Sequence, residues 1–105
     1  MIGWKQGYTL DRNYLVLIKL YIRDDAVINL KDTSSGEASY CNKAKVLDIT
    51  SHDGKVHIKI AVSMKDCSFK YYVGKTVTAQ NDPGIGSEPG IYFFRTKQEA
   101  IDYVY

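Results

Sequence analysis

Cysteine, proline and histidine are scarce in this chain, which has two of each. Cys41 and Cys67 lie far apart and neither belongs to a CxxC pair, so we expect two reduced thiols rather than a disulfide framework. His52 and His57 lack the spacing to these cysteines that a zinc site needs. We therefore predict no structural metal and no cofactor.

Long apolar runs and a surplus of one charge are absent as well. No stretch approaches the roughly 18 apolar residues of a membrane-spanning helix, and Met1–Lys5 does not begin a signal peptide. Fourteen basic and twelve acidic side chains leave a net charge of +2, which argues against a polybasic tail for nucleic acid or a membrane surface. We expect a cytoplasmic protein whose partner is neither a membrane nor nucleic acid.

Motifs of catalysis are also missing. The sequence has no nucleophile elbow, and the glycine-rich segment Asn81–Gly86 has neither the Lys-Ser/Thr pair of a Walker loop nor a helix directly after it. Asp24 and Asp25 are adjacent in sequence rather than facing each other, which suits an acid-base pair poorly. We expect a protein without enzymatic activity, folded as a single domain over residues 1–105, a length that supports one modest core.

The remaining pattern is rich in predicted strands. Residues 14–22 are apolar on both alternate faces and predict a central strand, whereas residues 29–42 are small and polar and predict a loop. Residues 44–50 and 55–63 predict a hairpin around the turn 51–54. In its second strand one face is apolar and the other is basic and expected in water; the apolar positions are Val56, Ile58, Ile60 and Val62.

The C-terminal third predicts short strands followed by a helix. Residues 70–77 form a strand or strand pair broken at Gly74, and residues 80–90 predict a loop. A last strand covers residues 90–94. Thr96 and Glu99 have the spacing of a capping box, followed by an apolar helix face with Ala100, Ile101 and Val104. The predicted fold is α+β, with a mainly antiparallel sheet of about five strands and a short C-terminal helix.

The last predicted strand combines aromatic and cationic side chains. Strand alternation places Tyr92 and Phe94 on one face and Ile91 and Phe93 on the other. One pair is expected in the core, and the other could present its rings beside Arg95. The sequence does not decide which pair faces outward, and ordinary sheet packing of both is the alternative to a ligand site.

Trp4 and Lys5 repeat this pairing of ring and cation near the N-terminus. An aromatic ring beside a cation is a common way to hold a nucleobase and its phosphate, and the planar guanidinium of Arg95 suits a phosphate. The predicted ligand-binding residues are Trp4, Lys5, Tyr92, Phe94, Arg95 and Lys97.

Several short stretches also carry a family resemblance. They are Val16–Leu20, Asp25-Ala26, Cys41, Ala44–Leu47, Ala61–Ser63, Ser68-Phe69, Tyr72–Gly74, Pro89–Phe94, Thr96, Glu99-Ala100 and Tyr103. In their order and spacing, the chain from about Leu15 onward resembles an uncharacterised domain of phage and giant-virus proteins that often follows pentapeptide repeats. Tyr92 stands where that family usually has His, and no pentapeptide repeats precede the domain. The resemblance implies a viral or phage origin, a location in the host cytoplasm and no established activity.

A shorter resemblance concerns Gly90–Phe93 with Ala100 and Tyr103. These residues are similar to the strand and helix of ADP-ribosyltransferases of the poly(ADP-ribose) polymerase type. The resemblance implies that Tyr92 stacks on a ligand and that Gly3–Lys5 replaces a missing His-Gly element. The superfamily's catalytic Glu lies on a later strand, beyond the end of this chain at Tyr105, so transferase activity is not expected.

Three functional hypotheses follow. The first is a non-catalytic viral or phage accessory protein that sequesters a nucleotide-like small molecule or defence signal. The second is a protein-interaction module that binds a host or virion protein, and the third is a reduced ADP-ribosyltransferase-like enzyme. Unpaired strand edges also make a homodimer a reasonable expectation.

Overall fold

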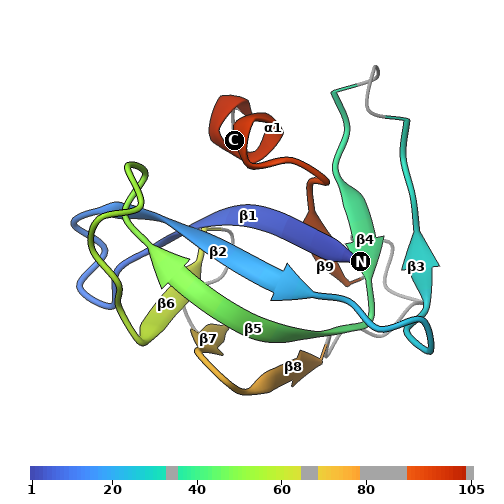
Figure 1. Cartoon of the computed structure of the whole chain (residues 1–105), viewed down its shortest axis with the longest axis horizontal. Coiled ribbons are helices and arrows are strands. Elements are labelled where there is room, and N and C mark those ends of the chain that lie inside the picture. The colour runs from blue at the N-terminus through green and yellow to red at the C-terminus, as the bar shows by residue number, and fades with distance from the viewer. Residues whose placement is uncertain (33–35, 65–68, 79–89, 104–105) are drawn as a thin grey trace.

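Nine strands and one short helix make up the described part of the chain (Figure 1). The computed structural model describes residues 1–32, 36–64, 69–78 and 90–103. Every strand pairing among them is antiparallel. The elements are β1 (Ile2–Tyr8), β2 (Leu15–Tyr21), β3 (Ile28–Asn29), β4 (Ser39–Cys41), β5 (Lys43–Thr50), β6 (Ile60–Ser63), β7 (Lys70–Tyr72), β8 (Thr76–Thr78), β9 (Ile91–Phe93) and α1 (Lys97–Asp102).

The predicted fold class is confirmed, with more and shorter strands than expected. One sheet has six strands in the order β7-β6-β1-β2-β5-β8, and a second has three in the order β3-β4-β9. The prediction of about five strands missed β1, and it assigned Asn29 of β3 and the whole of β4 to a loop over residues 29–42. Two glycines and two polar residues within Ile2–Tyr8 hide the alternation of β1, and β3 and β4 are only two and three residues long.

The six-stranded sheet curls until its two edges nearly meet. Its edge strands β7 and β8 are separated by only residues 73–75, which can span at most about 14 Å. The Val73 amide donates to the Lys59 carbonyl at 3.0 Å, and the Gly74 amide donates to the Val46 carbonyl at 2.8 Å. Gly74 adopts φ +86°, as its predicted role as a strand breaker requires. This short segment therefore joins β6 to β5 and closes the sheet into a barrel-like layer (Figure 1).

The two sheets are connected through β1. The amide and carbonyl of Trp4 bond the carbonyl and amide of Phe94, directly after β9, at 2.8 and 2.7 Å. This crossing brings the sheets so close that a Cβ atom on Gly3 would lie 2.8 Å from the Phe93 ring. Glycine at position 3 is therefore needed for the packing of Phe93, which is fully buried.

The predicted central strand is confirmed in β2. This strand lies between β1 and β5 and contributes to two apolar clusters. Val16, Ile18 and Leu20 pack into the larger one, and Leu17 packs with Ala100 in the other. Both faces are covered, which explains why neither alternate set of β2 is polar.

The predicted hairpin of residues 44–50 and 55–63 forms only next to its turn. The turn 51–54 forms, with Gly54 at φ +76°, but β6 pairs with β1 and β7 instead of β5. The two predicted strands are connected next to the turn, by an isolated bridge between Thr50 and His57 and by the His57 ring, which lies 3.0 Å from the Asp48 carboxylate. Val56 is 57% exposed. The alternation of apolar and polar residues correctly indicated a strand at β6. It did not predict the neighbour of that strand, because β6 pairs with the edge of β1 instead.

Helix α1 begins where the capping box predicted. The Thr96 hydroxyl accepts from the Glu99 amide at 3.2 Å and donates to the Glu99 carboxylate at 2.8 Å. Ala100 is fully buried, and the Gln6 amide donates to the carbonyls of Ala100 and Ile101 at 2.9 and 3.2 Å. These bonds fix α1 on the outer face of β1 and β2.

Three remaining expectations concern residues that the structure does not describe. Residues 80–89 of the predicted loop, Val104 of the predicted helix face and Cys67 lie outside the described residues. No helix within the described ranges has the length and apolar character needed to cross a membrane.

Replacing Thr96 with Ala should lower the free energy of unfolding by about 1 kcal/mol, because the Glu99 amide loses its capping oxygen. Thr96→Ser keeps the hydroxyl and serves as the matched control, with a much smaller loss. Urea denaturation of both variants measures the difference. Equal midpoints and slopes for Thr96→Ala and the wild type would show that the cap does not stabilise the fold.

Candidate functional site

The structure brings four of the six predicted ligand-binding residues together. Trp4 bonds Phe94 through the backbone, and the Lys5 ammonium lies 3.8 Å from the centroid of the Tyr92 ring. About ninety residues of sequence separate the two members of each pair. The N-terminal pair therefore lies next to the last strand, but the exposed ligand-binding surface expected there does not form.

The aromatic pair Tyr92 and Phe94 lies inside the protein. Each is 5% exposed, and Tyr103 packs against them with centroid distances of 6.5 and 4.9 Å. Tyr40 of β4 approaches Tyr92 edge-on at 6.5 Å.

The opposite face of β9 is buried too. Ile91 and Phe93 are 2% and 0% exposed and belong to the larger core cluster. The expectation that one pair presents its rings to a ligand is therefore wrong. The first sheet covers one face of β9, while α1 and Tyr103 cover the other, and neither layer can be inferred from alternation within β9.

Lys5 is an interior residue, 1% exposed, rather than a surface cation beside Trp4. Its ammonium donates to the Tyr71 hydroxyl at 2.6 Å. Successive residues of a strand point to opposite faces, so Lys5 and Trp4 cannot share one surface. The cation over the Trp4 ring is Lys19 of β2, at 5.4 Å. Nothing in the sequence pairs Lys19 with Trp4, because only the register of β1 with β2 places the two residues opposite each other.

Arg95 and Lys97 point to different parts of the molecule. The Arg95 guanidinium donates to the Lys31 carbonyl at 3.1 Å, just after β3. Lys97 lies by the turn 51–54, where the pKa of Asp53 is lowered first by the Ser51 hydroxyl and, to a smaller extent, by the charge of Lys97. The two cations do not converge on Tyr92, so the predicted nucleotide site is not assembled as one surface.

A different feature is open to a partner: the outer edge of β3, which we call the edge segment (residues 27–31). Val27 is 71% and Leu30 is 47% exposed. The backbone amide of Asn42 donates to the Val27 carbonyl, and Asn29 is opposite Tyr40. The backbone amide of Lys31 donates to the Ser39 hydroxyl.

These bonds determine which backbone groups of the edge segment remain accessible. Positions 27, 29 and 31 are turned toward β4. In an antiparallel pair the intervening residues point their amides and carbonyls away from the partner strand. The backbone groups of Ile28 and Leu30 are thus directed outward, on the outermost strand of the three-stranded sheet.

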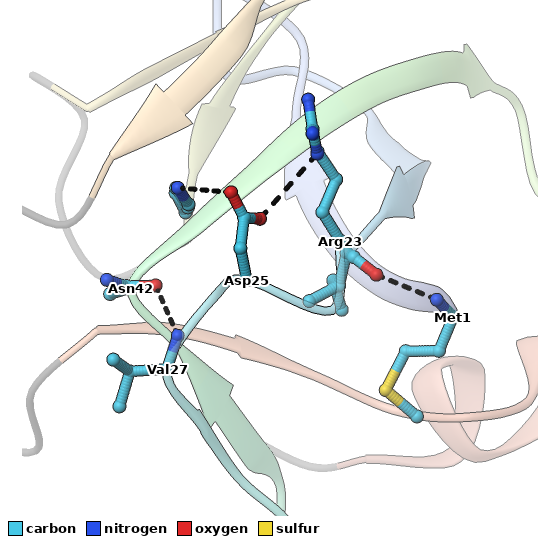
Figure 2. Close-up of polar contacts among 7 residues, drawn as sticks. Met1, Arg23, Asp25, Val27 and Asn42 are labelled. Carbon is cyan, nitrogen blue, oxygen red and sulfur yellow. Dashed lines mark hydrogen bonds and ion pairs between the residues drawn. The ribbon is translucent and has the colours of Figure 1, made fainter.

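The edge segment is anchored at both ends. The Val27 amide donates to the Asn42 side chain at 2.9 Å (Figure 2), and Asp25 lies 3.3 Å from the Lys43 ammonium and 3.6 Å from Arg23. The pKa of Asp25 is lowered chiefly by its hydrogen bond to Lys43. Arg95 holds the other end through Lys31. The segment is therefore a preformed strand edge, although most of it falls within the predicted loop of residues 29–42.

Groups that bind metals or act as nucleophiles do not gather within the described ranges. No three His, Cys, Asp or Glu side chains there could share a metal ion. Cys41 is a free, buried thiol. Burial raises the pKa of the Cys41 thiol from 9.0 to about 11, against the smaller opposing effect of the Lys5 charge, which suits a structural rather than a reactive thiol.

The raised pKa of Cys41 predicts slow alkylation of the folded protein. At pH 8 a shift from 9 to about 11 lowers the thiolate fraction about 100-fold, and burial slows the reaction further. In a Cys67→Ser variant, iodoacetamide should therefore label the native protein at least about 100-fold more slowly than the urea-denatured protein. Equal labelling rates would contradict the buried, protonated thiol.

The hydrogen bond between Lys5 and Tyr71 predicts a non-additive mutant pair. Tyr71→Phe should cost about 1–3 kcal/mol, because the buried ammonium loses an oxygen that solvates it. Lys5→Met removes the charge at similar length, so the double variant should lose less stability than the sum of the single variants. Chemical denaturation of the four proteins measures the coupling, and strict additivity would exclude it.

Comparison with known proteins identifies a family but no function. No curated protein and no solved structure matches the chain. The phage or giant-virus origin and the link to pentapeptide repeats stay predictions, as does the likeness to ADP-ribosyltransferases. Residues 1–100 match the family of unknown function DUF5758, and the match spans nearly the whole chain. The chain belongs to this family.

Proposed function

We propose that this protein is a non-catalytic protein-interaction module that binds an extended segment of its partner as an added strand along β3. The observation that carries the proposal is the outward-directed backbone of Ile28 and Leu30 on an exposed strand edge. Such an edge is a template for another chain unless it is covered, bulged or blocked by proline. The edge segment, Val27-Ile28-Asn29-Leu30-Lys31, contains no proline.

The geometry divides affinity and selectivity between backbone and side chains. An added strand would bond the amides and carbonyls of Ile28 and Leu30, each bond contributing about 0.5–1.5 kcal/mol net. Selectivity would come from the alternating side chains. Leu30 and the half-buried Ile28 favour apolar partners on one face, while Val27, Asn29 and Lys31 line the other.

Preorganisation supports the proposal. Binding to a disordered segment costs the free energy of ordering it. Here Asn42, the ion pairs of Asp25 and the Arg95 guanidinium already hold the edge segment extended. Arg95, predicted as a phosphate ligand, would then act by positioning the strand that binds.

A second copy of the chain is one partner that fits the edge. In an antiparallel pair centred on Asn29, Ile28 of each copy would face Leu30 of the other. These are the two residues with outward backbone groups, so bonded positions meet bonded positions, and apolar side chains meet on one face. Symmetric pairing would join the two three-stranded sheets into one, which is the form that the expected homodimer would take.

The nucleotide-binding hypothesis is not favoured by a specific observation. Its stacking pair is buried, Lys5 is bonded to Tyr71, and the two remaining cations serve other elements. A role as a phage accessory protein is compatible with an interaction module and rests on the resemblance alone.

A display selection of random extended peptides tests the proposed function. Selected peptides should alternate apolar residues and shift the amide resonances of Ile28 and Leu30 of the labelled protein. Leu30→Pro removes an outward amide and should abolish binding without unfolding the protein, whereas Leu30→Thr keeps the amide and should retain part of it. The same resonances should shift as the protein is concentrated if copies pair. Peptides that bind Leu30→Pro as well as wild type would sink the proposal.

A further inference from the structure

Lysines gather around the turn that closes the six-stranded sheet. The amide of Lys75 donates to the carbonyl of Tyr72 at 3.0 Å, which makes residues 72–75 a tight turn with Cα ends less than about 7 Å apart. Lys75 belongs to the turn, and Lys70 lies on β7, two residues before Tyr72. We call the group of Tyr72, Lys45, Lys59, Lys70 and Lys75 the lysine corner.

The neighbouring strands supply the other two lysines. Lys45 of β5 is opposite Thr76, the residue after the turn. The carbonyl of Lys59, just before β6, accepts the amide of Val73 within the turn. Neighbouring antiparallel residues have Cα atoms about 4.5–5.5 Å apart, so the backbones of all four lysines lie in the turn or within a few residues of it.

The lysine corner is exposed, and its lysines form no ion pair with the acidic residues that the structure describes. All four lysines are exposed, and Tyr72 is 41% exposed. Residues 70–78 contain no acidic residue. The ion pairs between described residues involve Arg23, Asp25, Lys43, Asp48 and His57, and none of the four lysines. The whole-chain charge of +2 therefore does not show that four lysines are grouped around one turn.

Tyr72 adds a flat apolar ring to this charge. Strand alternation places Tyr72 and Lys70 on the outer face of β7, opposite the buried Tyr71. Lysines that contact a phosphate backbone and an aromatic ring that stacks on a base are the two elements of single-strand binding. Within the turn itself, Val73 at 37% exposure is the apolar side chain, and one aliphatic side chain gives the turn little to insert into a lipid bilayer.

We propose that the lysine corner binds single-stranded nucleic acid, with the four lysines on phosphates and Tyr72 stacked on a base. This reverses the expectation, drawn from net charge, that nucleic acid is not a partner. The site is separate from the edge segment and does not depend on the proposed function.

Fluorescence anisotropy of a labelled oligothymidine of about 12 nucleotides tests the proposal, as a function of salt. Log affinity should fall linearly with log salt, by about 0.7 for each phosphate contact. Lys75→Gln and Lys45→Gln should each lower that slope by about 0.7. Tyr72→Ala should weaken binding about 5- to 150-fold.

Matched variants separate this site from unspecific attraction. Lys97→Gln removes one charge at α1, and Tyr14→Ala removes a tyrosine that is 69% exposed directly before β2, at the end of that strand away from Lys45. Neither should change the affinity beyond about twofold, and thermal melts should show that all variants fold. No binding at low salt, or equal losses in these controls, would overturn the proposal. So would equal binding of polyphosphate, polyglutamate or anionic vesicles, which would identify a general anion surface instead.

Discussion

The backbone of β1 bonds to three partners at once, and the arrangement of the rest follows from this sharing. Along its whole length β1 pairs with β2, at one end it pairs with β6, and at Trp4 it bonds Phe94. The first two pairings build the barrel-like sheet, and the third attaches the three-stranded sheet to it. A strand in this position must let neighbouring segments of the chain approach its backbone closely. Gly3 does so beside Phe93, and Gly7 does so beside Ile18 and the carbonyl of Val62.

The same constraint explains why the predicted ligand site became interior. Between its two glycines, β1 sends only the side chain of Lys5 inward, where Tyr71 and Tyr92 surround the ammonium. Aromatic rings and a hydroxyl stabilise a charge that would otherwise be costly to bury. The combination of ring and cation, which on a surface would suit a nucleotide, here serves the cohesion of the core.

The surfaces left open belong to the peripheral strands. The small sheet ends at β3, whose outward backbone has no neighbouring strand among the described residues, and the large sheet closes through the turn 72–75, around which the four lysines lie. A strand edge is suited to another backbone, and a corner of lysines is suited to a polyanion. The two surfaces differ in chemistry and belong to different sheets (Figure 1). One chain could therefore bind a strand and a polyanion without competition between them.

The sequence by itself determined the elements whose signals are local. The apolar run of residues 14–22 specified β2, Thr96 and Glu99 specified the start of α1, and Gly54 and Gly74 specified their turns, because capping, turn geometry and two-sided burial depend on adjacent residues. The tertiary structure alone decided the partner of β6, the interior position of Lys5 and Tyr92, the strand β1 and the meeting of Lys45, Lys59, Lys70 and Lys75. Each of these depends on which strands pair and in which register. Alternation of apolar and polar residues within a strand predicts that one face is buried, but the neighbouring strands determine which residues cover that face.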